Sequence, residues 1–177
     1  MVTDVIRFVK RQVFLTRLEV IKQQIFLCCA ALLLIAACAP SDPGSTIKGV
    51  SYNAEQIAQG RVYYEQTCAA CHGIDGRGQF PEAPFEPDAT GRLGAPPHNE
   101  TGHTWHHSDE LLLRYVVEGG FSDPNNFYTM PRWDSLYDRD DAALIIAYIK
   151  TMWTEEQRIY QQRVTLDEEA WVAQTQP

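Results

Sequence analysis

Two of the chain's five cysteines stand in the sequence Cys68-Ala69-Ala70-Cys71-His72. Two thiols three positions apart, followed directly by an imidazole, restrict the chemistry of this segment to a few kinds of site. These are a zinc half-site, a redox-active dithiol and the attachment site of a c-type haem. Each of them needs a different setting in the rest of the chain, so this motif constrains the fold more than any other feature of the sequence.

The rest of the sequence favours the haem. A structural zinc site needs two more ligands, but Cys68, Cys71 and Cys38 are the only cysteines from residue 38 onward. A thioredoxin-like dithiol belongs in a βαβ setting, and the sequence has no alternating strand pattern. In a c-type site each thiol adds to one porphyrin vinyl group and the histidine ligates the iron. We therefore predict one covalent haem c on Cys68 and Cys71, with His72 as an axial ligand.

A methionine is the predicted second axial ligand. Only Met130 and Met152 follow the motif, and Met152 falls in an apolar helical segment, which is typical of core packing. Met130 precedes Pro131, which keeps this segment out of a helix, and a soft thioether sulfur favours Fe(II) and raises the potential. Two alternatives stay open: Met130 as an ordinary packing residue, and a histidine from the cluster described below as the distal ligand.

The first 37 residues have the pattern of a bacterial signal peptide. Residues 1–24 hold five of the fifteen basic residues, and residues 25–37 form an uncharged apolar run. Thirteen apolar residues suit a secretory signal and fall short of the ~20 needed to span a bilayer. The run ends in Ile35-Ala36-Ala37-Cys38, which resembles a lipobox, where the cysteine is acylated. Ordinary cleavage near Cys38 is the alternative, and the long basic leader leaves the start codon open.

This reading predicts an exported protein that is attached by lipid at Cys38, in the periplasm or on the outer face of the cytoplasmic membrane. Residues 38–51 are rich in Pro, Gly and Ser and are expected to form a flexible tether. Residues 38–177 contain 10 basic and 21 acidic residues, a formal charge of −11. So acidic a chain lacks the clustered cations that bind nucleic acid, and we predict no nucleic-acid partner.

The domain over residues 52–153 is predicted to be all-α, with about three core helices and long loops. The first helix is expected over Asn53–Thr67, with Asn53 as its N-cap. A second should begin after Ser108, over Asp109–Glu118, and end at Gly119-Gly120. The third is expected over Ala142–Trp153, started by Asp140 or Asp141. Residues 154–177 form a C-terminal extension, for which one or two helical turns are expected.

The order of these features resembles the class I monohaem cytochrome c family over roughly residues 52–153. In that family a glycine eight residues before the first haem cysteine crosses an aromatic residue of the C-terminal helix. Gly60 occupies that offset, Tyr64 is the aromatic residue four positions on, and Tyr148 is the matching aromatic residue in the third helix. The resemblance implies a cytochrome c-like fold around one haem and a protein that transfers electrons.

The segment between His72 and Ser108 is longer than in small soluble carriers of that family and contains four histidines: His98, His103, His106 and His107. One interpretation is a second metal site, such as copper. We favour another, because no acidic or cysteine ligand stands close by: these groups line the haem edge. Arg92 and Trp105 would then contact the haem propionates, while the histidines cap the helix at Ser108 or face water.

With both axial positions filled, the iron has no open position for a substrate. The sequence therefore predicts an electron carrier and not an enzyme, which transfers single electrons between respiratory or photosynthetic redox proteins. These partners are expected to carry a basic patch and to dock transiently at the haem edge. One alternative is a haem c subunit docked in a larger oxidoreductase complex through residues 154–177. Another is a sensor or peroxidase-like enzyme in which Met130 leaves the iron.

Overall fold

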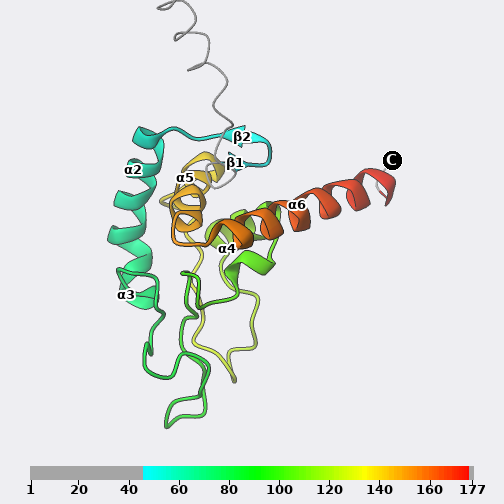
Figure 1. Ribbon diagram of the computed structural model, residues 1–177. Helices are drawn as coiled ribbons and strands as arrows, with labels where there is room; N and C mark the ends of the chain where they lie inside the picture. Colours follow the sequence, from blue (N-terminus) through cyan, green and yellow to red (C-terminus); the bar gives the residue numbers. More distant parts are fainter. Residues whose placement is uncertain (1–45, 176–177) are drawn as a thin grey trace, which may run out of the picture. The chain divides into compact units, whose positions relative to one another are not determined.

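The computed structural model of the chain describes residues 46–175. The predicted signal peptide, the lipidation site Cys38 and most of the predicted tether lie outside the described residues. Within residues 46–175, no helix combines the length and the apolar character that crossing a membrane requires. The described part is mainly helical, as predicted, and its order of elements can be followed in Figure 1.

The haem motif lies at the end of a long helical segment. Helix α2 (Ala54–Tyr63) begins with a capping box, in which the Asn53 side chain accepts from the Gln56 backbone and the Gln56 side chain accepts from Asn53. The helix continues through a π-helical turn, η2 (Tyr64–Cys68), into α3 (Ala69–His72). Gly73, at φ 79°, ends the segment directly after the histidine.

Helix α2 packs against α5 (Arg139–Lys150), which lies beside it in Figure 1. Gly60 is buried at the crossing, where a Cβ on this residue would collide with the backbone carbonyl of Leu144. The rings of Tyr64 and Tyr148 meet edge to face one turn further on, 5.4 Å between centroids. The crossing predicted from Gly60, Tyr64 and Tyr148 is confirmed, with the glycine itself against backbone and the aromatic pair beside it.

Helix α4 (Asp109–Glu118) has the predicted bounds, because the Ser108 side chain accepts from Leu111 and Gly119 breaks the helix at φ 87°. Helix α5 begins earlier than predicted, because the Asp138 side chain caps it. The core lies among α2, α4 and α5. Its largest contribution comes from buried side chains of α4 and α5: Leu112, Leu113, Val116, Ala142, Ala143, Ile145, Ile146, Ala147 and Ile149.

Two predictions of local structure were wrong. Residues 46–51, expected to belong to a flexible tether, form an antiparallel hairpin of β1 (Thr46–Ile47) and β2 (Val50–Ser51), because the Ile47 side chain is buried in the core. The C-terminal extension forms one long helix, α6 (Glu155–Thr175), in place of one or two turns. It packs on α4 and on a short 3₁₀ helix, η3 (Thr104–His106).

Candidate functional site

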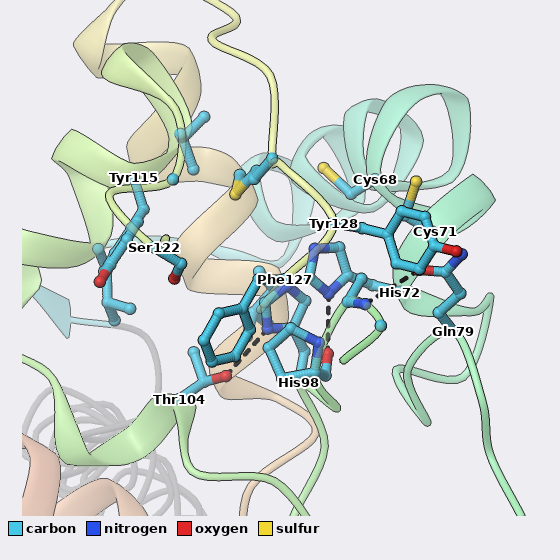
Figure 2. Close-up of a pocket in the computed structure, with 18 of the residues that line it drawn as sticks. Cys68, Cys71, His72, Gln79, His98, Thr104, Tyr115, Ser122, Phe127 and Tyr128 are labelled. Atoms are coloured by element: carbon cyan, nitrogen blue, oxygen red, sulfur yellow. Dashed lines mark hydrogen bonds between the residues drawn. The ribbon is translucent and has the colours of Figure 1, made fainter. Parts of the chain in front are cut away.

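A cavity of about 470 Å³ lies next to the Cys-x-x-Cys-His motif. Figure 2 shows Cys68, Cys71 and His72 at its wall, together with His98 and Tyr128. Most of the remaining wall is apolar and comes from α4, α5 and two loops: Leu112, Val116, Ile145, Ile146, Ile149, Leu93, Phe127 and Trp133. An apolar cavity of this size with a few polar groups is typical of a cofactor site.

The two loops of the wall are joined to each other by backbone hydrogen bonds. Leu93 donates to Asn126 and accepts from Tyr128, which forms an isolated parallel bridge between Leu93 and Phe127. The Tyr128 hydroxyl also donates to the Asp88 carboxylate at 2.7 Å. The long irregular segments of the chain are therefore ordered around the cavity.

The two cysteines of the motif face the same cavity as free thiols. Cys68 is buried and Cys71 is exposed. Burial, and secondarily the neighbouring Cys71, raises the pKa of the Cys68 thiol to about 12. A reactive dithiol depends on a thiolate with a lowered pKa, which this environment does not provide. It fits a sulfur that becomes a neutral thioether.

The orientation of His72 is fixed by one hydrogen bond. Its ring is buried, and Nδ1 lies 2.8 Å from the carbonyl oxygen of Pro96. A carbonyl only accepts, so Nδ1 carries the proton and Nε2 has a free lone pair. Burial lowers the pKa of His72, and the bond to Pro96 opposes this in part. The imidazole is therefore neutral and oriented, which is the form that ligates a metal.

A second histidine supports the first. The ring of His98 stacks on that of His72, 3.8 Å between centroids at 22° (Figure 2). The His98 ring is bound through Nδ1 to the Thr104 hydroxyl at 2.9 Å, and its backbone carbonyl accepts from the Trp153 indole. Burial, followed by His72 and His103, lowers the pKa of His98 well below its ordinary value. The His98 ring is therefore neutral and packs against the face of the His72 ring.

Met130 lines the cavity, and Met152 does not. The backbone of Met130 is held by the end of α4, because the Gly120 N–H donates to the Met130 carbonyl at 3.0 Å. Gly119 faces the same carbonyl so closely that a Cβ would lie 2.9 Å from the oxygen. Met152 packs against the core beside Gly76. The wall thus offers a single thioether sulfur among the described residues.

Residues 57–153 match the family model for cytochrome c. The chain belongs to the cytochrome c family. Neither the curated proteins nor the solved structures compared with it include a match. Membership implies a covalently bound haem c, and the Cys68 and Cys71 thiols stand at the required spacing. The geometry of the cavity fits this group: paired thiols, an oriented free imidazole nitrogen and apolar walls. When bound, haem supplies one-electron redox chemistry, which is the chemistry typical of this family.

The structure places the other predicted site residues of this cytochrome c in two groups. His98, His103 and His107 line the cavity, whereas Arg92, Trp105 and His106 do not. The Trp105 indole N–H donates to the Gly102 carbonyl. The Arg92 guanidinium lies 4.2 Å from the centre of the Tyr128 ring and bonds Thr90. The propionate role of Arg92 and Trp105 stays a prediction, because neither side chain lines the cavity.

The described residues contain no group of three or more His, Cys, Asp or Glu side chains arranged to hold a metal ion. The interpretation of the four histidines as a copper site is therefore wrong for this part of the chain. Sequence reasoning also missed that His98 packs on His72. No local pattern marks this pair, because a long loop brings together residues far apart in the sequence.

Proposed function

We propose that this chain is a class I, monohaem cytochrome c, tethered to the outer side of a bacterial membrane by lipid, which carries single electrons between proteins. The observation that carries the proposal is the shared cavity wall of Cys68, Cys71, His72 and Met130. The chain has one Cys-x-x-Cys-His sequence, which supports a single haem.

His72 and Met130 are the proposed axial ligands. The hydrogen bond from His72 to the Pro96 carbonyl leaves Nε2 available as a ligand. The hydrogen bond from the Gly120 N–H to the Met130 carbonyl holds the loop of Met130 at the cavity wall. A methionine opposite a histidine stabilises Fe(II) and raises the potential relative to two nitrogen ligands. With both positions filled the protein exchanges electrons without binding a substrate at the iron.

Partners are proposed to dock at the cavity edge near Cys71. Cys71 is exposed although it lines the cavity, and the same holds for Phe85, so we expect an edge of the haem to be accessible to a partner. The formal charge of −11 over residues 38–177 favours a partner with a basic patch. Attraction between opposite charges is screened by salt, so electron transfer to such a partner should slow as ionic strength rises.

The visible spectrum of the haem-loaded protein tests the axial ligands. Methionine on ferric haem gives a weak far-red charge-transfer band, and a six-coordinate ferrous haem does not bind CO rapidly. We expect Met130→Ala to remove the band and to admit CO, and the matched control Met152→Leu to keep the band. A wild-type protein without the band that binds CO rapidly would contradict the carrier function and support a sensor or peroxidase-like enzyme.

The lipid anchor is tested separately. We expect the haem-bearing protein to sediment with membranes and Cys38→Ser to release it into the soluble fraction. Retention of the variant in membranes would assign anchoring to another element. If detergent-solubilised protein is recovered only with other polypeptides, it is a subunit of a larger complex and not a free carrier.

A further inference from the structure

The cavity wall of residues 46–175 contains no lysine, arginine, aspartate or glutamate side chain. A cavity that receives haem must also accommodate two propionate groups, which are anionic at neutral pH. Anions close to a protein interior need a cation or several hydrogen-bond donors. Among the wall residues, only histidines can supply a positive charge.

Two of the four histidines that line the cavity already have hydrogen-bond partners. His72 is bound to Pro96, and His98 is stacked on His72 and bound to Thr104. His103 and His107 remain, and their ring centroids are 5.5 Å apart. Neither ring has a hydrogen bond among those that the structure gives for the described residues.

The short helix η3 explains why these two histidines face the cavity together. It occupies Thr104–His106, so His103 and His107 flank one tight turn, closed by the His106 N–H to the His103 carbonyl and the His107 N–H to the Thr104 carbonyl. The histidine between them points elsewhere: the His106 ring lies on Trp105 and near Tyr160 of α6, outside the cavity wall.

We propose that His103 and His107 form the subsite that receives the haem propionates, and that uptake of a proton at this pair accompanies reduction of the haem. The inference depends on haem c in this cavity and is independent of the nature of the distal ligand. It replaces the propionate role predicted for Arg92 and Trp105.

Helix α6 holds this subsite in place. The Gln161 side-chain amide is buried and donates to the His107 carbonyl at 3.1 Å and to Asp109 at 2.8 Å. Gln157, one turn earlier, donates to the Glu100 carbonyl. Both contacts fall on the segment that carries the two histidines. Because the family match ends at residue 153, α6 is an addition to the matched domain, and Gln161 is a positioning residue that it supplies.

The proton balance follows from electrostatics. One electron from an external one-electron donor reduces the haem iron, and His103 or His107 takes one proton from solvent, so the charge near the propionates is unchanged. Added negative charge favours the protonated imidazole. The histidine therefore has a lower pKa in the oxidised protein than in the reduced protein. Between these two pKa values the reduction potential of the haem should fall as pH rises, and outside this window the potential should not depend on pH.

The surroundings of the pair suit this role. Burial lowers the pKa of both histidines, with His106 as the next cause for His103, and His103 followed by His106 for His107. The other titratable groups that face the pair are His98 and Tyr115. The nearest carboxylate along the chain, Asp109, is turned to Lys150 of α5. The pair is thus neutral without a nearby anion and has capacity to take up a proton.

Potentiometric titration of the haem-loaded full chain at pH 5 to 9 tests the inference. We expect the wild-type potential to fall with pH, each of His103→Gln and His107→Gln to reduce the slope, and the double variant to lose it. The control His106→Gln, from the same turn but outside the wall, should keep the slope. Gln161→Met should shift the pH window while haem content and spectrum stay unchanged.

Three results would overturn the proposal. The first is a wild-type reduction potential that does not depend on pH. This measurement uses the wild-type protein, so it does not depend on whether any variant folds. The second is a double variant that folds with full haem content and retains the wild-type slope. The third is a wild-type protein that lacks the far-red band and binds CO slowly, in which His103→Gln or His107→Gln allows rapid CO binding, because that histidine would then be an iron ligand. Absence of covalent haem in the wild type would instead refute the cavity as a haem site.

Discussion

Gly60 of α2 lies directly against the backbone carbonyl of Leu144 in α5. This contact sets how closely the helix that leads into the haem motif approaches the helix that forms the floor of the cavity. A glycine in a helix costs up to about 1 kcal/mol relative to alanine, so its presence here is explained by the close crossing.

Replacement of Gly60 should therefore destabilise the protein. We expect Gly60→Ala to lower the free energy of unfolding by about 1–3 kcal/mol, because the added methyl group overpacks backbone that cannot move aside, and Gly60→Val to lower it further. Urea denaturation of the haem-loaded protein measures this. Ala58→Ser, exposed on the same helix, should stay within about 0.5 kcal/mol of wild type. Equal stability of Gly60→Ala and wild type would contradict the close crossing.

The loop that carries Met130 should depend on Gly119. This residue combines φ 87° with close contact to the Met130 carbonyl, whereas Gly91 has φ 83° and open space around it. We expect Gly119→Ala to weaken the far-red band proposed for methionine ligation and Gly91→Ala to leave it intact, although both add backbone strain. Similar loss of the band in both variants would mean that strain alone disturbs the loop.

A buried ion pair should make a large contribution to stability. Lys150 donates to Asp109 at 2.7 Å, and both side chains are almost inaccessible, at 2% and 4% exposure. Removing one partner leaves a buried charge, so Asp109→Asn and Lys150→Met should each cost about 3–5 kcal/mol. Chemical denaturation should show that the double variant loses less than the sum of the two.

The matched control for that pair is Glu118→Gln. It breaks an ion pair with Arg114 on the exposed face of α4, and the denaturation midpoint should not change measurably. Strict additivity in the Asp109 and Lys150 cycle would show that the two side chains do not interact in solution.

Acid stability should depend on Asp88. Hydrogen bonds from Thr90, and then from Tyr128, lower the pKa of this carboxyl below its ordinary value. A depressed pKa in the folded protein contributes stability above the unfolded value of about 3.9, and that contribution is lost as pH falls below it. Asp88→Asn should therefore flatten the loss of stability below about pH 4.

Unfolding followed at several pH values checks this prediction. Asp123→Asn, which removes a carboxylate bonded only to neighbours in its own turn, serves as the comparison. If Asp88→Asn lost stability with falling pH as steeply as the wild type, the hydrogen bond between Asp88 and Tyr128 would not persist in solution.

Local sequence signals predicted the helices and the haem motif well. Asn53, Ser108 and Gly119 mark helix ends through short-range hydrogen bonds and backbone geometry. Such signals depend only on neighbouring residues, so the sequence alone predicts them. The length of α6 could not be predicted, because its apolar residues do not lie on one face, and its buried positions include the polar side chains of Gln161 and Thr165.

The positions of the polar groups around the cavity could not be predicted for a related reason. Trp105 and Arg92 were chosen by residue type, which says nothing of where a side chain points within an irregular segment. The short helix η3 determines which histidines of the cluster face the cavity. It is a single turn, so no periodic pattern in the sequence predicts it. The stacking of His98 on His72 likewise joins two segments through the long loop alone.

The π-helical turn η2 has a consequence for how the chain tolerates insertions and deletions. It widens the helix by one residue between Tyr64, which faces α5, and the haem cysteines. Each residue of a helix turns the chain by about 100°. Deleting one residue from Glu65–Thr67 would convert this wide turn to an ordinary α-helical one and leave Tyr64 and the haem motif on the faces that they now occupy. An extra residue between Gly60 and Tyr63 has no such turn to absorb it and would rotate both thiols and His72 away from the cavity. The segment that leads into the haem motif therefore tolerates a change of length in η2 better than in α2.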